Sequence, residues 1–575
     1  MTKRDYSSWT QEELLAELDH LVSNKKFGLV WEDQTEDEST SFSTYIPTAK
    51  ELDSKKLVSA PGAATNLLIE GDNLFSLSLL NYTHLESVDI IYIDPPYNTG
   101  ENDFNYNDRF VRKDDSYRHS KWLSFINKRL LLAKDLLTPE GVIFVSIGND
   151  EVHRLRLLME EIFGEANHLA TITRVQKAGS DQGTHFARSV DYVLAFAKNK
   201  DLLPPFSQFV TEEYEASFKQ VDHETGNKYK EKGLYQASLD PMRGCVNQRY
   251  YIKAPDGSLC IPPGNIFPSV AEDGAKIPPA SKQDKVWRWS RDRYLQEIPN
   301  LIFKKTKKSP LVDQFGQPSI WNVYTKQFLN SEKGALPRDF VDKYDNSQGT
   351  IALKQLGLEF SFAKPVWLIA DLLGMTNKPN ALVLDFFAGS GTTGQAVLQL
   401  NREDGGNRSF ILCTNNEGNI AEDICYPRIQ RVISGYQDEK YDEFIGIPSN
   451  LRYFKVGLIS NSTTDANRKR LTREAIGLLC IRENAFEKTL ESDQLQVFEN
   501  EQGRVAILLD EFDLEALKGE IEENPDKHYR VYAFSLSNDD LSEELRVFGS
   551  RVASLPIPEG ILNTYFRNLE DIRRR

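Results

Sequence analysis

Apolar and polar positions alternate along the chain in the pattern that a parallel α/β sheet produces. Short apolar runs occupy residues 67–69, 88–93 and 142–147, and polar or glycine-containing turns follow each of them. Two similar runs return far downstream, at residues 381–387 and 410–413. Apolar runs of this length, separated by longer segments, predict strands that are buried on both faces. We therefore expect one mostly parallel sheet that is interrupted by an inserted domain.

The stretch that separates the two parts of the predicted sheet has a different composition. Residues 203–346 are rich in proline, glycine, lysine, arginine and aromatic side chains. Basic residues interleaved with aromatics are typical of surfaces that bind nucleic acid. The alternating Trp287 and Trp289 are equally consistent with packing inside the inserted domain, and a lysine run is often only a solvated face. The candidate DNA contacts are Trp287, Arg288, Lys304, Lys305, Lys307 and Lys308.

The ends of the chain differ from its centre. Residues 10–13 match a helix capping box, and leucines and a valine at helical spacing follow as far as residue 22, which predicts a short amphipathic helix. Residues 32–43 are polar and predict a surface loop. After Tyr436 the balance of charges is acidic and no chemical motif is recognisable.

Length and composition narrow the class of protein. At 575 residues the chain is too long for a single hydrophobic core. A hydrophobic content of 40%, 27% charged residues and the lack of any apolar run of about 20 residues argue against membrane insertion. The polar N-terminus has no signal core, which predicts a cytoplasmic protein. The five scattered cysteines predict neither a disulfide framework nor a metal site.

The net charge of −16 is unfavourable for a DNA-binding protein, because lysine and arginine contacts to phosphates supply much of the affinity for DNA. The charge is unevenly distributed, however. Residues 241–310 hold 13 Lys and Arg against 6 Asp and Glu, whereas the tail of the chain is acidic. A localised DNA-contacting face in the insert is therefore compatible with an acidic chain.

The most specific candidate for chemistry is Asp94-Pro95-Pro96-Tyr97, which directly follows the apolar run at 88–93. Ligands bind at the C-terminal ends of strands in open parallel sheets. Consecutive prolines stiffen the turn and hold the Pro95 carbonyl in one direction. An amine could donate its hydrogens to the Asp94 carboxylate and to that carbonyl, which leaves the nitrogen lone pair free to attack an electrophilic methyl carbon. Tyr97 could stack on a displaced base, although a plain strand-ending turn is the alternative.

A weaker candidate for contact with a base or with DNA is Trp122, at the start of an apolar helical stretch. An aromatic residue at helical spacing is more often part of the core.

A second candidate site lies in residues 385–393, Asp-Phe-Phe-Ala-Gly-Ser-Gly-Thr-Thr, after the run at 381–384. Glycines let the backbone approach a ligand closely, and the start of the next helix offers free N–H groups. The spacing matches neither the G-x-G-x-x-G of dinucleotide sites nor a P-loop. A carboxylate at the place of Glu417 commonly takes ribose hydroxyls, although a solvated turn is the alternative. The candidate cofactor contacts are Asp72, Asp385, Phe387, Ala388, Gly389, Ser390, Gly391, Thr392 and Glu417.

Together the two motifs resemble the signatures of amino-methylating DNA methyltransferases, Asp-Pro-Pro-Tyr and the Phe-x-Gly-x-Gly of residues 387–391. The catalytic motif precedes the cofactor loop, as in the permuted beta class, and in that class Asp-Pro-Pro-Tyr points to adenine N6 rather than cytosine N4. The chain is similar over nearly its whole length to modification subunits of type III restriction-modification systems. The similar stretches are residues 26–33, 94–100, 105–108, 364–365 and 450–454.

The resemblance implies a class I S-adenosylmethionine-dependent methyltransferase fold: a Rossmann-like, circularly permuted sheet of seven mostly parallel strands, with an inserted target recognition domain and a smaller α+β C-terminal domain. It implies S-adenosylmethionine as cofactor, double-stranded DNA as substrate, base flipping, a homodimer and a helicase-nuclease restriction subunit as a possible partner. Catalysis would fall on Asp94, Pro95, Pro96 and Tyr97. One departure from the family pattern is Val190-Asp191-Tyr192, and we assign Asp191 no role.

The predicted domains are an N-terminal helical and linker region (1–60), the catalytic half of the methyltransferase (61–202), the target recognition domain (203–346), the cofactor-binding half (347–436) and a C-terminal domain for dimer or partner contacts (437–575). Three alternatives stay open. The chain could be a solitary DNA methyltransferase, a methyltransferase for RNA or a glutamine side chain, or a DNA-binding protein without turnover.

Overall fold

The computed structural model describes residues 10, 31–32, 42–60, 62–101, 103–106, 109–176, 185–207, 218–223, 225–328, 336–360, 362–437, 443–462, 464–509, 514–535, 539 and 541–573. The amphipathic helix expected up to residue 22 lies outside the described residues, as do most of the polar loop, residues 26–30, and Asn107 and Asp108. The chain divides into two compact units: residues Met1–Ser207 with Leu336–Arg575, and residues Gln208–Ala335. Among the described residues, no helix is long and apolar enough to cross a membrane.

The first unit is built on one large sheet, as the hydrophobic pattern predicts. Its strand order is β1-β19-β3-β18-β17-β4-β7-β9-β8-β16, with β2 paired to β19. The strands from β19 to β7 are parallel, whereas β9 is antiparallel to both of its neighbours. The bounds are β1 (Tyr45–Glu51), β2 (Leu57–Val58), β3 (Thr65–Glu70), β4 (Val88–Ile93), β7 (Leu137–Ile147), β8 (His168–Val175), β9 (Val190–Ala197), β16 (Phe340–Val341), β17 (Leu382–Asp385), β18 (Ser409–Thr414) and β19 (Asn450–Ser460).

This arrangement confirms the predicted α/β fold and its permutation. Strands that precede the insert in the sequence and strands that follow it belong to one sheet. The described sheet has 11 strands and is wider than the seven expected. The seven central strands, β3 to β8 in the spatial order, are the expected ones. Strands β19, β1 and β2 extend one side of them and β16 extends the other.

Helices cover both faces of the sheet because alternate strand residues point to opposite sides. In β4, Ile91 and Ile93 join one apolar cluster, which includes helices α3, α4 and α5. Ile90 and Tyr92 join a second cluster on the other face, which includes helices α9, α10 and α11. The bounds of the helices are α3 (Asn73–Thr83), α4 (Arg118–Leu136), α5 (Val152–Phe163), α8 (Asn346–Gln355), α9 (Val366–Gly374), α10 (Thr392–Asp404) and α11 (Tyr426–Ser434). Short elements complete this region: η1 (Asp53–Lys55), β5 (Asn105–Tyr106), β6 (Arg109–Phe110), η2 (Glu165–Asn167), η4 (Glu417–Asn419) and the π-helix η5 (Ile420–Cys425).

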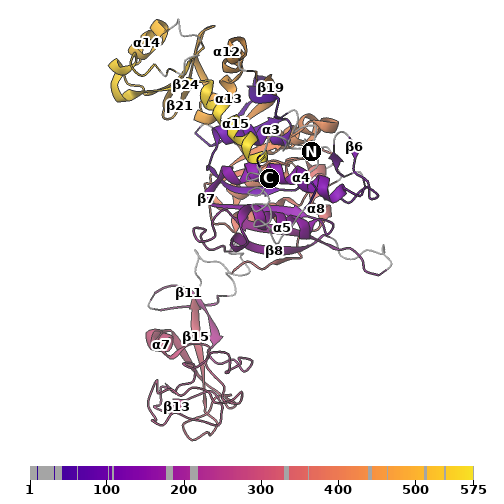
Figure 1. The fold of residues 1–575 in the computed structure, drawn as a ribbon. Coiled ribbons are helices and arrows are strands. Elements are labelled where there is room, and N and C mark those ends of the chain that lie inside the picture. The colour runs from indigo at the N-terminus through magenta and orange to yellow at the C-terminus, as the bar shows by residue number, and fades with distance from the viewer. Residues whose placement is uncertain are drawn as a thin grey trace. The chain divides into compact units, whose positions relative to one another are not determined.

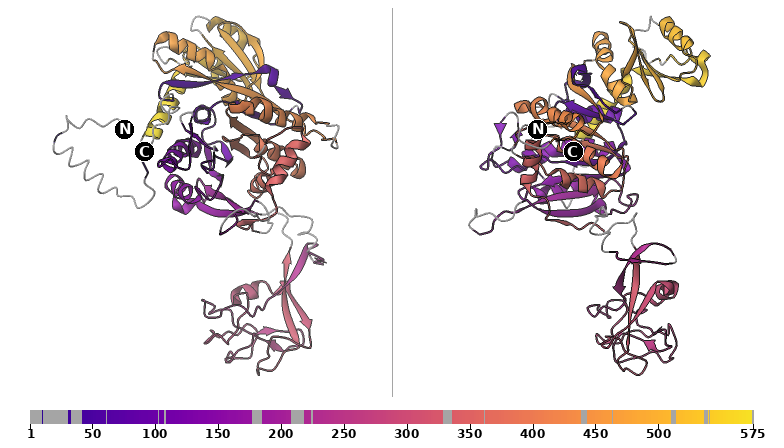
Figure 2. Two further views of the ribbon diagram at one scale, coloured as in Figure 1. Left: turned by 90° about the vertical axis from the view of Figure 1, so that its right-hand side faces the viewer. Right: turned by 180° about the vertical axis from the view of Figure 1, so that it is seen from behind.

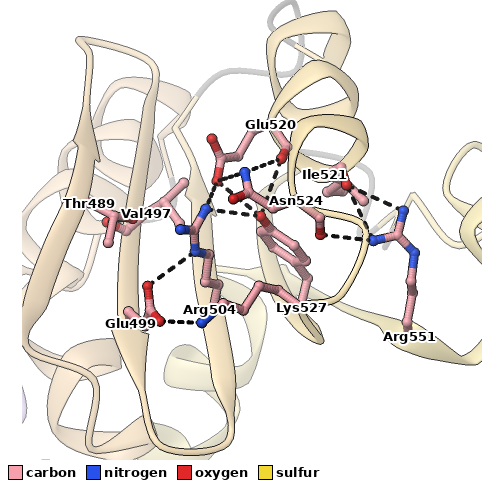
Figure 3. A network of polar contacts seen from close by, with 10 residues as sticks. Thr489, Val497, Glu499, Arg504, Glu520, Ile521, Asn524, Lys527 and Arg551 are labelled. Carbon is pink, nitrogen blue, oxygen red and sulfur yellow. Dashed lines mark hydrogen bonds and ion pairs between the residues drawn. The ribbon is translucent and has the colours of Figure 1, made fainter.

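The last part of the chain adds a second, five-stranded sheet to the first unit. Its order is β20-β21-β22-β23-β24, antiparallel up to β22 and parallel from there. Arg504 on β22 donates to Glu520 of helix α14 and to Glu499 on β21, and these charged contacts hold the helix to the sheet (Figure 3). The bounds are α12 (Asp465–Glu474), α13 (Ile476–Glu483), β20 (Glu487–Glu491), β21 (Leu495–Asn500), β22 (Gly503–Leu508), α14 (Leu514–Glu523), β23 (Tyr529–Phe534), η7 (Arg546–Arg551), β24 (Val552–Ile557) and α15 (Glu559–Arg573).

Two elements of this last part belong to the large sheet and its helix layer. Strand β19 pairs with β3, and helix α15 lies against α3 (Figures 1 and 2). Tyr565 and Asn568 of α15 donate hydrogen bonds to Phe42 and Ser78. The domain boundary predicted between residues 436 and 437 therefore does not coincide with the edge of this sheet.

The second unit has its own sheet and core. Its sheet has the order β10-β11-β15-β14, and a separate hairpin pairs β12 with β13. The core gathers aromatic side chains, among them Tyr250, Trp287, Tyr294 and Trp321. The bounds are β10 (Gln220–Val221), β11 (Lys228–Gly233), β12 (Ile252–Lys253), β13 (Leu259–Cys260), α7 (Arg291–Gln296), η3 (Ile298–Asn300), β14 (Leu301–Lys305) and β15 (Trp321–Phe328).

Candidate active site

The two motifs that the sequence singled out follow adjacent parallel strands of one sheet. Strand β17 pairs with β4 through Val383 opposite Ile90 and Leu384 opposite Ile91. The Asp-Pro-Pro-Tyr turn follows β4, and the glycine loop continues from Asp385 at the end of β17. Parallel strands end on the same edge of a sheet, so the proline turn and the glycine loop lie side by side there.

Strands β18 and β3 continue the same edge. Glu417 follows β18, and Asp72 follows β3 as the N-cap of helix α3. All the predicted catalytic and cofactor-binding residues therefore come from the C-terminal ends of four neighbouring strands. In open parallel sheets, this edge is where ligands bind.

Asp94 has one carboxylate oxygen engaged and one free. Lys364, immediately before helix α9, donates from Nζ to Asp94 Oδ2 at 2.7 Å. Within the described part of the chain, Asp94 Oδ1 is buried and has no hydrogen-bond partner. A buried acceptor without a partner is costly, so its presence marks a place where a donor belongs. The contact with Lys364 was not predicted, although Lys364-Pro365 was one of the stretches that carried the resemblance.

Trp122 fixes the proline turn from behind. Its indole Nε1 donates to the Pro96 carbonyl at 2.8 Å. The side chain extends from helix α4 and is fully buried in the apolar core of the first unit. The core alternative for Trp122 is therefore the one found, and direct contact of this residue with DNA is excluded by its burial. The residue acts on the site only through the turn that it holds.

Tyr97 is held on two sides. Its ring lies against Gly148, where a Cβ would come within 2.7 Å of Tyr97 Cδ2, and Lys364 Nζ is 4.8 Å from the ring centroid. The Tyr97 hydroxyl donates to Asp191 Oδ2 at 3.3 Å. Burial raises the pKa of the Tyr97 phenol, and the nearby Asp94 and Asp191 charges raise it further, so the ring stays neutral.

Asp191, to which we assigned no role, is part of this site. Both its side chain and that of Arg174 are buried, and Arg174 Nε donates to Asp191 Oδ1 at 2.8 Å. Arg174 also donates to Asn346 Oδ1. The pair orients the Tyr97 hydroxyl from beneath. The sequence did contain a signal, since Asp191 is a lone carboxylate in the otherwise apolar strand β9.

Asp385 stabilises the glycine loop from inside. The Asp385 Oδ1 atom accepts from the Phe387 N–H at 3.0 Å, and Oδ2 accepts from the Thr393 hydroxyl. Burial raises the pKa of the Asp385 carboxyl to about 7. Asp385 therefore shapes the loop, and its carboxylate oxygens are taken by the loop itself.

This raised pKa predicts a pH dependence of stability. The folded chain binds the Asp385 proton more tightly than the unfolded chain, so the proton stabilises the fold at low pH and this contribution is lost as pH rises through 7. Relative to Asp385→Asn, which keeps an acceptor and a donor, the wild type should lose on the order of 1 kcal/mol between pH 6 and pH 8. Melting temperatures of both proteins at the two pH values measure this, and equal changes in both would contradict it.

Arg428 of helix α11 is a third residue that sequence reasoning missed, after Lys364 and Asp191. It is fully buried and donates to Ser390 Oγ at 3.0 Å, Thr392 Oγ1 at 2.7 Å and Gln395 Oε1 at 2.8 Å. Burial lowers the pKa of its guanidinium to about 9. The side chains of Ser390 and Thr392 are thus turned to the interior. Any contact of these two residues with a cofactor would come from their backbone.

The remaining loop residues leave room for a ligand. Gly389 and Gly391 have positive φ angles of 49° and 78°, which favour glycine. A Cβ at Gly389 would meet only the Phe387 carbonyl, at 3.8 Å, so the space over it is open. A Cβ at Gly391 would come within 3.0 Å of Cys425 Sγ, so helix packing excludes a side chain there.

Asp72 and Glu417 differ in how they are held. Asp72 Oδ1 caps helix α3 by accepting from the Leu74 N–H at 2.8 Å, and Oδ2 lies 3.3 Å from Arg129 Nη2. A quarter of the Asp72 side chain remains exposed. Glu417 is exposed at the start of η4. Both carboxylates can therefore reach a ligand, and Asp72 is the better fixed of the two.

The predicted DNA contacts of the second unit are placed differently from one another. Trp287 is fully buried in the core and donates from Nε1 to the Tyr250 carbonyl, so a direct contact of its side chain with DNA is contradicted. Lys304 pairs with Glu231, and Lys305 lies 5.2 Å from the Trp321 ring centroid. The other three predicted contacts, Arg288, Lys307 and Lys308, reach the surface at least in part.

Comparisons with known proteins show the family to which the chain is similar. A sequence profile of the DNA methylase family matches residues 88–462. The Mod subunit of the type III restriction-modification enzyme EcoPI, from Escherichia phage P1, is 32% identical over 382 residues, which cover 61% of this chain and 58% of that protein. The Mod subunit of the StyLTI enzyme, from Salmonella typhimurium strain LT2, is 28% identical over 405 residues, covering 64% of this chain and 57% of that protein.

The likeness to solved structures is weaker. The cytosine-N4-specific PvuII DNA methyltransferase is 12% identical with a TM-score of 0.31, and the match covers 66% of this chain and 89% of that one. The chain spans less than two thirds of the length of the curated Mod subunits that it matches. The family profile, in contrast, covers well over half of the chain and includes both motifs. The chain belongs to the DNA methylase family.

Proposed function

We propose that the chain is a site-specific DNA methyltransferase that transfers a methyl group from S-adenosylmethionine to N6 of an adenine flipped out of duplex DNA. The observation that carries the proposal is the buried, unpaired Oδ1 of Asp94, beside the glycine loop on one sheet edge. An amine with two hydrogens satisfies this acceptor. Membership of the DNA methylase family supports the same reaction class.

Asp94 and the Pro95 carbonyl orient the target amine in this mechanism. Asp94 Oδ1 accepts one N–H, and the carbonyl that the Pro95-Pro96 turn holds in place accepts the other. With both hydrogens engaged, the nitrogen lone pair points out of the plane of the base, toward the glycine loop. Orientation of this kind can supply on the order of 7 to 11 kcal/mol of a reaction barrier.

Tyr97 and Lys364 complete the pocket for the base. The Tyr97 ring, held by Gly148 and Asp191, offers a flat face on which the displaced base stacks. Lys364 holds Asp94 through Oδ2 and so leaves Oδ1 for the substrate. Lys364 is thus a positioning residue that acts through Asp94.

The residues around the glycine loop suit S-adenosylmethionine. When bound, the cofactor supplies a methyl carbon made electrophilic by its sulfonium. The open space over Gly389 admits a ligand close to the backbone, and the first turn of α10 offers N–H groups to its carboxylate. Glu417 and the exposed part of Asp72 are carboxylates that accept from hydroxyl or amine groups. Phe387, half-buried beside the Phe125 ring, adds an apolar wall.

Methyl transfer from tritiated S-adenosylmethionine to duplex DNA tests the activity. Digestion of the product to nucleosides and mass spectrometry then separates N6-methyladenine from N4-methylcytosine. We expect N6-methyladenine, because Asp-Pro-Pro-Tyr is the motif that this class uses for adenine. Labelled N4-methylcytosine would contradict the choice of adenine as the target base. DNA that acquires no label would contradict the proposed methyltransferase activity.

We further propose that the chain forms a homodimer and is the modification and site-recognition subunit of a type III restriction-modification system. The names of its relatives support this, since three of them are type III Mod subunits. Light scattering after gel filtration tests the dimer. Copurification with a helicase-nuclease subunit encoded by the same organism tests the partner, and a lack of any such subunit would favour a solitary methyltransferase.

Lys364→Met should lower kcat for methyl transfer about tenfold while the Kd for S-adenosylmethionine changes less than twofold. The physical reason is that the Asp94 carboxylate, freed from its 2.7 Å contact, rotates among several orientations. Lys364→Arg should restore part of kcat because it keeps a donor near Oδ2. Steady-state kinetics with Lys354→Met, an exposed lysine of α8, as control would measure this. A change in Kd with kcat intact would contradict the positioning role.

A further inference from the structure

A pocket of about 370 Å³ in the second unit gathers four basic side chains, Lys232, Arg288, Arg293 and Lys326, from four separate segments. Lys232 comes from the end of β11, Arg288 from the loop before α7, and Arg293 from α7 itself (Figure 1 labels β11, β15 and α7). Thr325 and Gln327 of β15 line the same pocket. The pocket is formed entirely within the second unit.

Strand alternation makes the position of Lys232 unusual. Lys232 pairs with Thr325, which shares its face of the sheet with Val323 and Trp321. Those two residues belong to the apolar core, so Lys232 lies on the core-facing side of β11 where the core gives way to the pocket. Lys304 lies on the opposite face and is paired with Glu231. The Lys232 side chain is itself exposed, so its ammonium can be reached by a ligand from solvent.

Among the described residues, three of the four cations that line the pocket have no carboxylate partner, and the fourth, Lys326, is paired with Asp222. None of Lys232, Arg288 and Arg293 forms an ion pair there, whereas Lys304 and Lys326 of the same sheet each contact a carboxylate. Partial burial and the charges of Arg288 and Lys230 lower the pKa of the Lys232 ammonium. Like charges are thus held together at a cost that an anion would remove.

Each of the two arginines contacts a neighbouring group of the second unit. The Arg293 guanidinium lies 4.8 Å from the Trp289 ring centroid, and Arg288 Nη1 donates to the Gly233 carbonyl at 3.4 Å. The carboxylate in the pocket wall, Glu297, accepts from Asn300 Nδ2 at 2.6 Å. Guanidinium groups held in this way match the oxygens of a phosphate with two parallel hydrogen bonds.

We propose that this pocket binds a DNA backbone phosphate and positions the second unit on the duplex, with Lys232, Arg288 and Arg293 as its ligands. The inference rests on the proposed function, because DNA is the substrate of the proposed methyltransferase. Of the predicted DNA contacts, it retains Arg288 and sets aside the buried Trp287 and the paired Lys304. A basic pocket on a chain of net charge −16 also concentrates the attraction for DNA at one place.

Salt dependence of DNA binding tests the pocket. The full chain is titrated into a fluorescein-labelled mixed-sequence duplex of about 30 base pairs, at several NaCl concentrations from about 50 to 300 mM, and anisotropy gives the affinity at each. Each lost phosphate contact should reduce the slope of log K against log salt by about one. Arg288→Gln with Arg293→Gln should therefore reduce the slope by about two, and weaken binding at least about tenfold at low salt.

A matched control removes the same charge elsewhere. Lys253→Gln with Lys282→Gln deletes two exposed cations of the second unit outside the pocket and should leave the slope unchanged. Arg288→Lys with Arg293→Lys keeps the charge and should keep the slope while weakening binding, which guards against misfolding of the glutamine variant. A pocket variant with the slope of the control would overturn the proposal, as would a wild-type chain that does not bind DNA.

The methyl-transfer assay distinguishes failure of the proposed function from failure of the pocket proposal. A wild-type chain that binds DNA through the pocket but transfers no methyl group would overturn the proposed function and leave the pocket standing. Methyl transfer that persists with an unchanged slope in the pocket variant would do the reverse.

Discussion

Asp94→Ala should lower the rate of methyl transfer to DNA by about 10³-fold while S-adenosylmethionine still binds. The substitution removes Oδ1, the acceptor that we assign to the target amine, and leaves the partly buried Lys364 ammonium without its carboxylate partner. Loss of one oriented polar contact at a reacting group typically costs on the order of 10²- to 10³-fold in rate. Here the same contact also sets the direction of the nitrogen lone pair, so we expect a loss at the upper end of that range.

Isothermal titration with S-adenosylmethionine and the tritium assay measure the two parts of this prediction. Glu101→Gln is a suitable control, because Glu101 is an exposed residue of the same loop whose carboxylate pairs with Lys113. Its rate should stay within about twofold of the wild type. Methyl transfer by Asp94→Ala within tenfold of the wild-type rate would sink the catalytic assignment, whereas loss of cofactor binding would point to a damaged fold.

The central sheet could be predicted because each of its strands has a hydrophobic pattern that is visible in a few consecutive residues. Strands buried on both faces, such as β4 and β18, are continuous apolar runs, and such runs are visible in the sequence without any knowledge of their neighbours. The outer strand β19 could not be placed in this way. Its pairing with β3 joins segments almost 400 residues apart. The hydrophobic pattern of β19 does not indicate with which strand it pairs.

The candidate site divides along the same line. Asp94 to Tyr97 and the glycine loop were predictable because each carries its chemistry within a few consecutive residues. Lys364, Asp191 and Arg428 reach the site from other strands and helices, and their contacts exist only once the sheet has formed. Trp122 shows the same limit, since its spacing predicts burial but not the hydrogen bond to Pro96.

Arg428→Met should weaken S-adenosylmethionine binding at least about tenfold, which corresponds to about 1.4 kcal/mol. Two effects on stability oppose each other in this variant. Removal of the buried guanidinium is favourable in one respect, because the charge no longer has to be desolvated. The desolvation free energy is large, as the lowering of the Arg428 pKa to about 9 by burial indicates. Gln395 Oε1 then loses the Arg428 donor at about 1 to 3 kcal/mol, whereas the Ser390 and Thr392 hydroxyls lose the guanidinium but still contact each other at 3.3 Å.

The hydrogen bonds lost with the guanidinium outweigh the desolvation free energy that its removal saves, because methionine fills the space but donates no hydrogen bond. We expect a net loss of about 2 kcal/mol in unfolding free energy. The loss of cofactor affinity follows from the same contacts, since they hold residues 390–392 beside the two glycines whose backbone faces the ligand. A loop free to move by an ångström no longer presents its N–H groups in the right direction.

Arg431→Met, one turn further along α11, separates this effect from general damage to the helix. Arg431 donates to the Leu356 carbonyl and stacks on Tyr436, away from the glycine loop. Its loss should cost about 1 kcal/mol of stability with cofactor affinity unchanged. Thermal melting and isothermal titration of both variants decide the matter. If Arg428→Met and Arg431→Met bound S-adenosylmethionine equally well, the glycine loop would not depend on Arg428, and the role assigned to that side chain would be wrong.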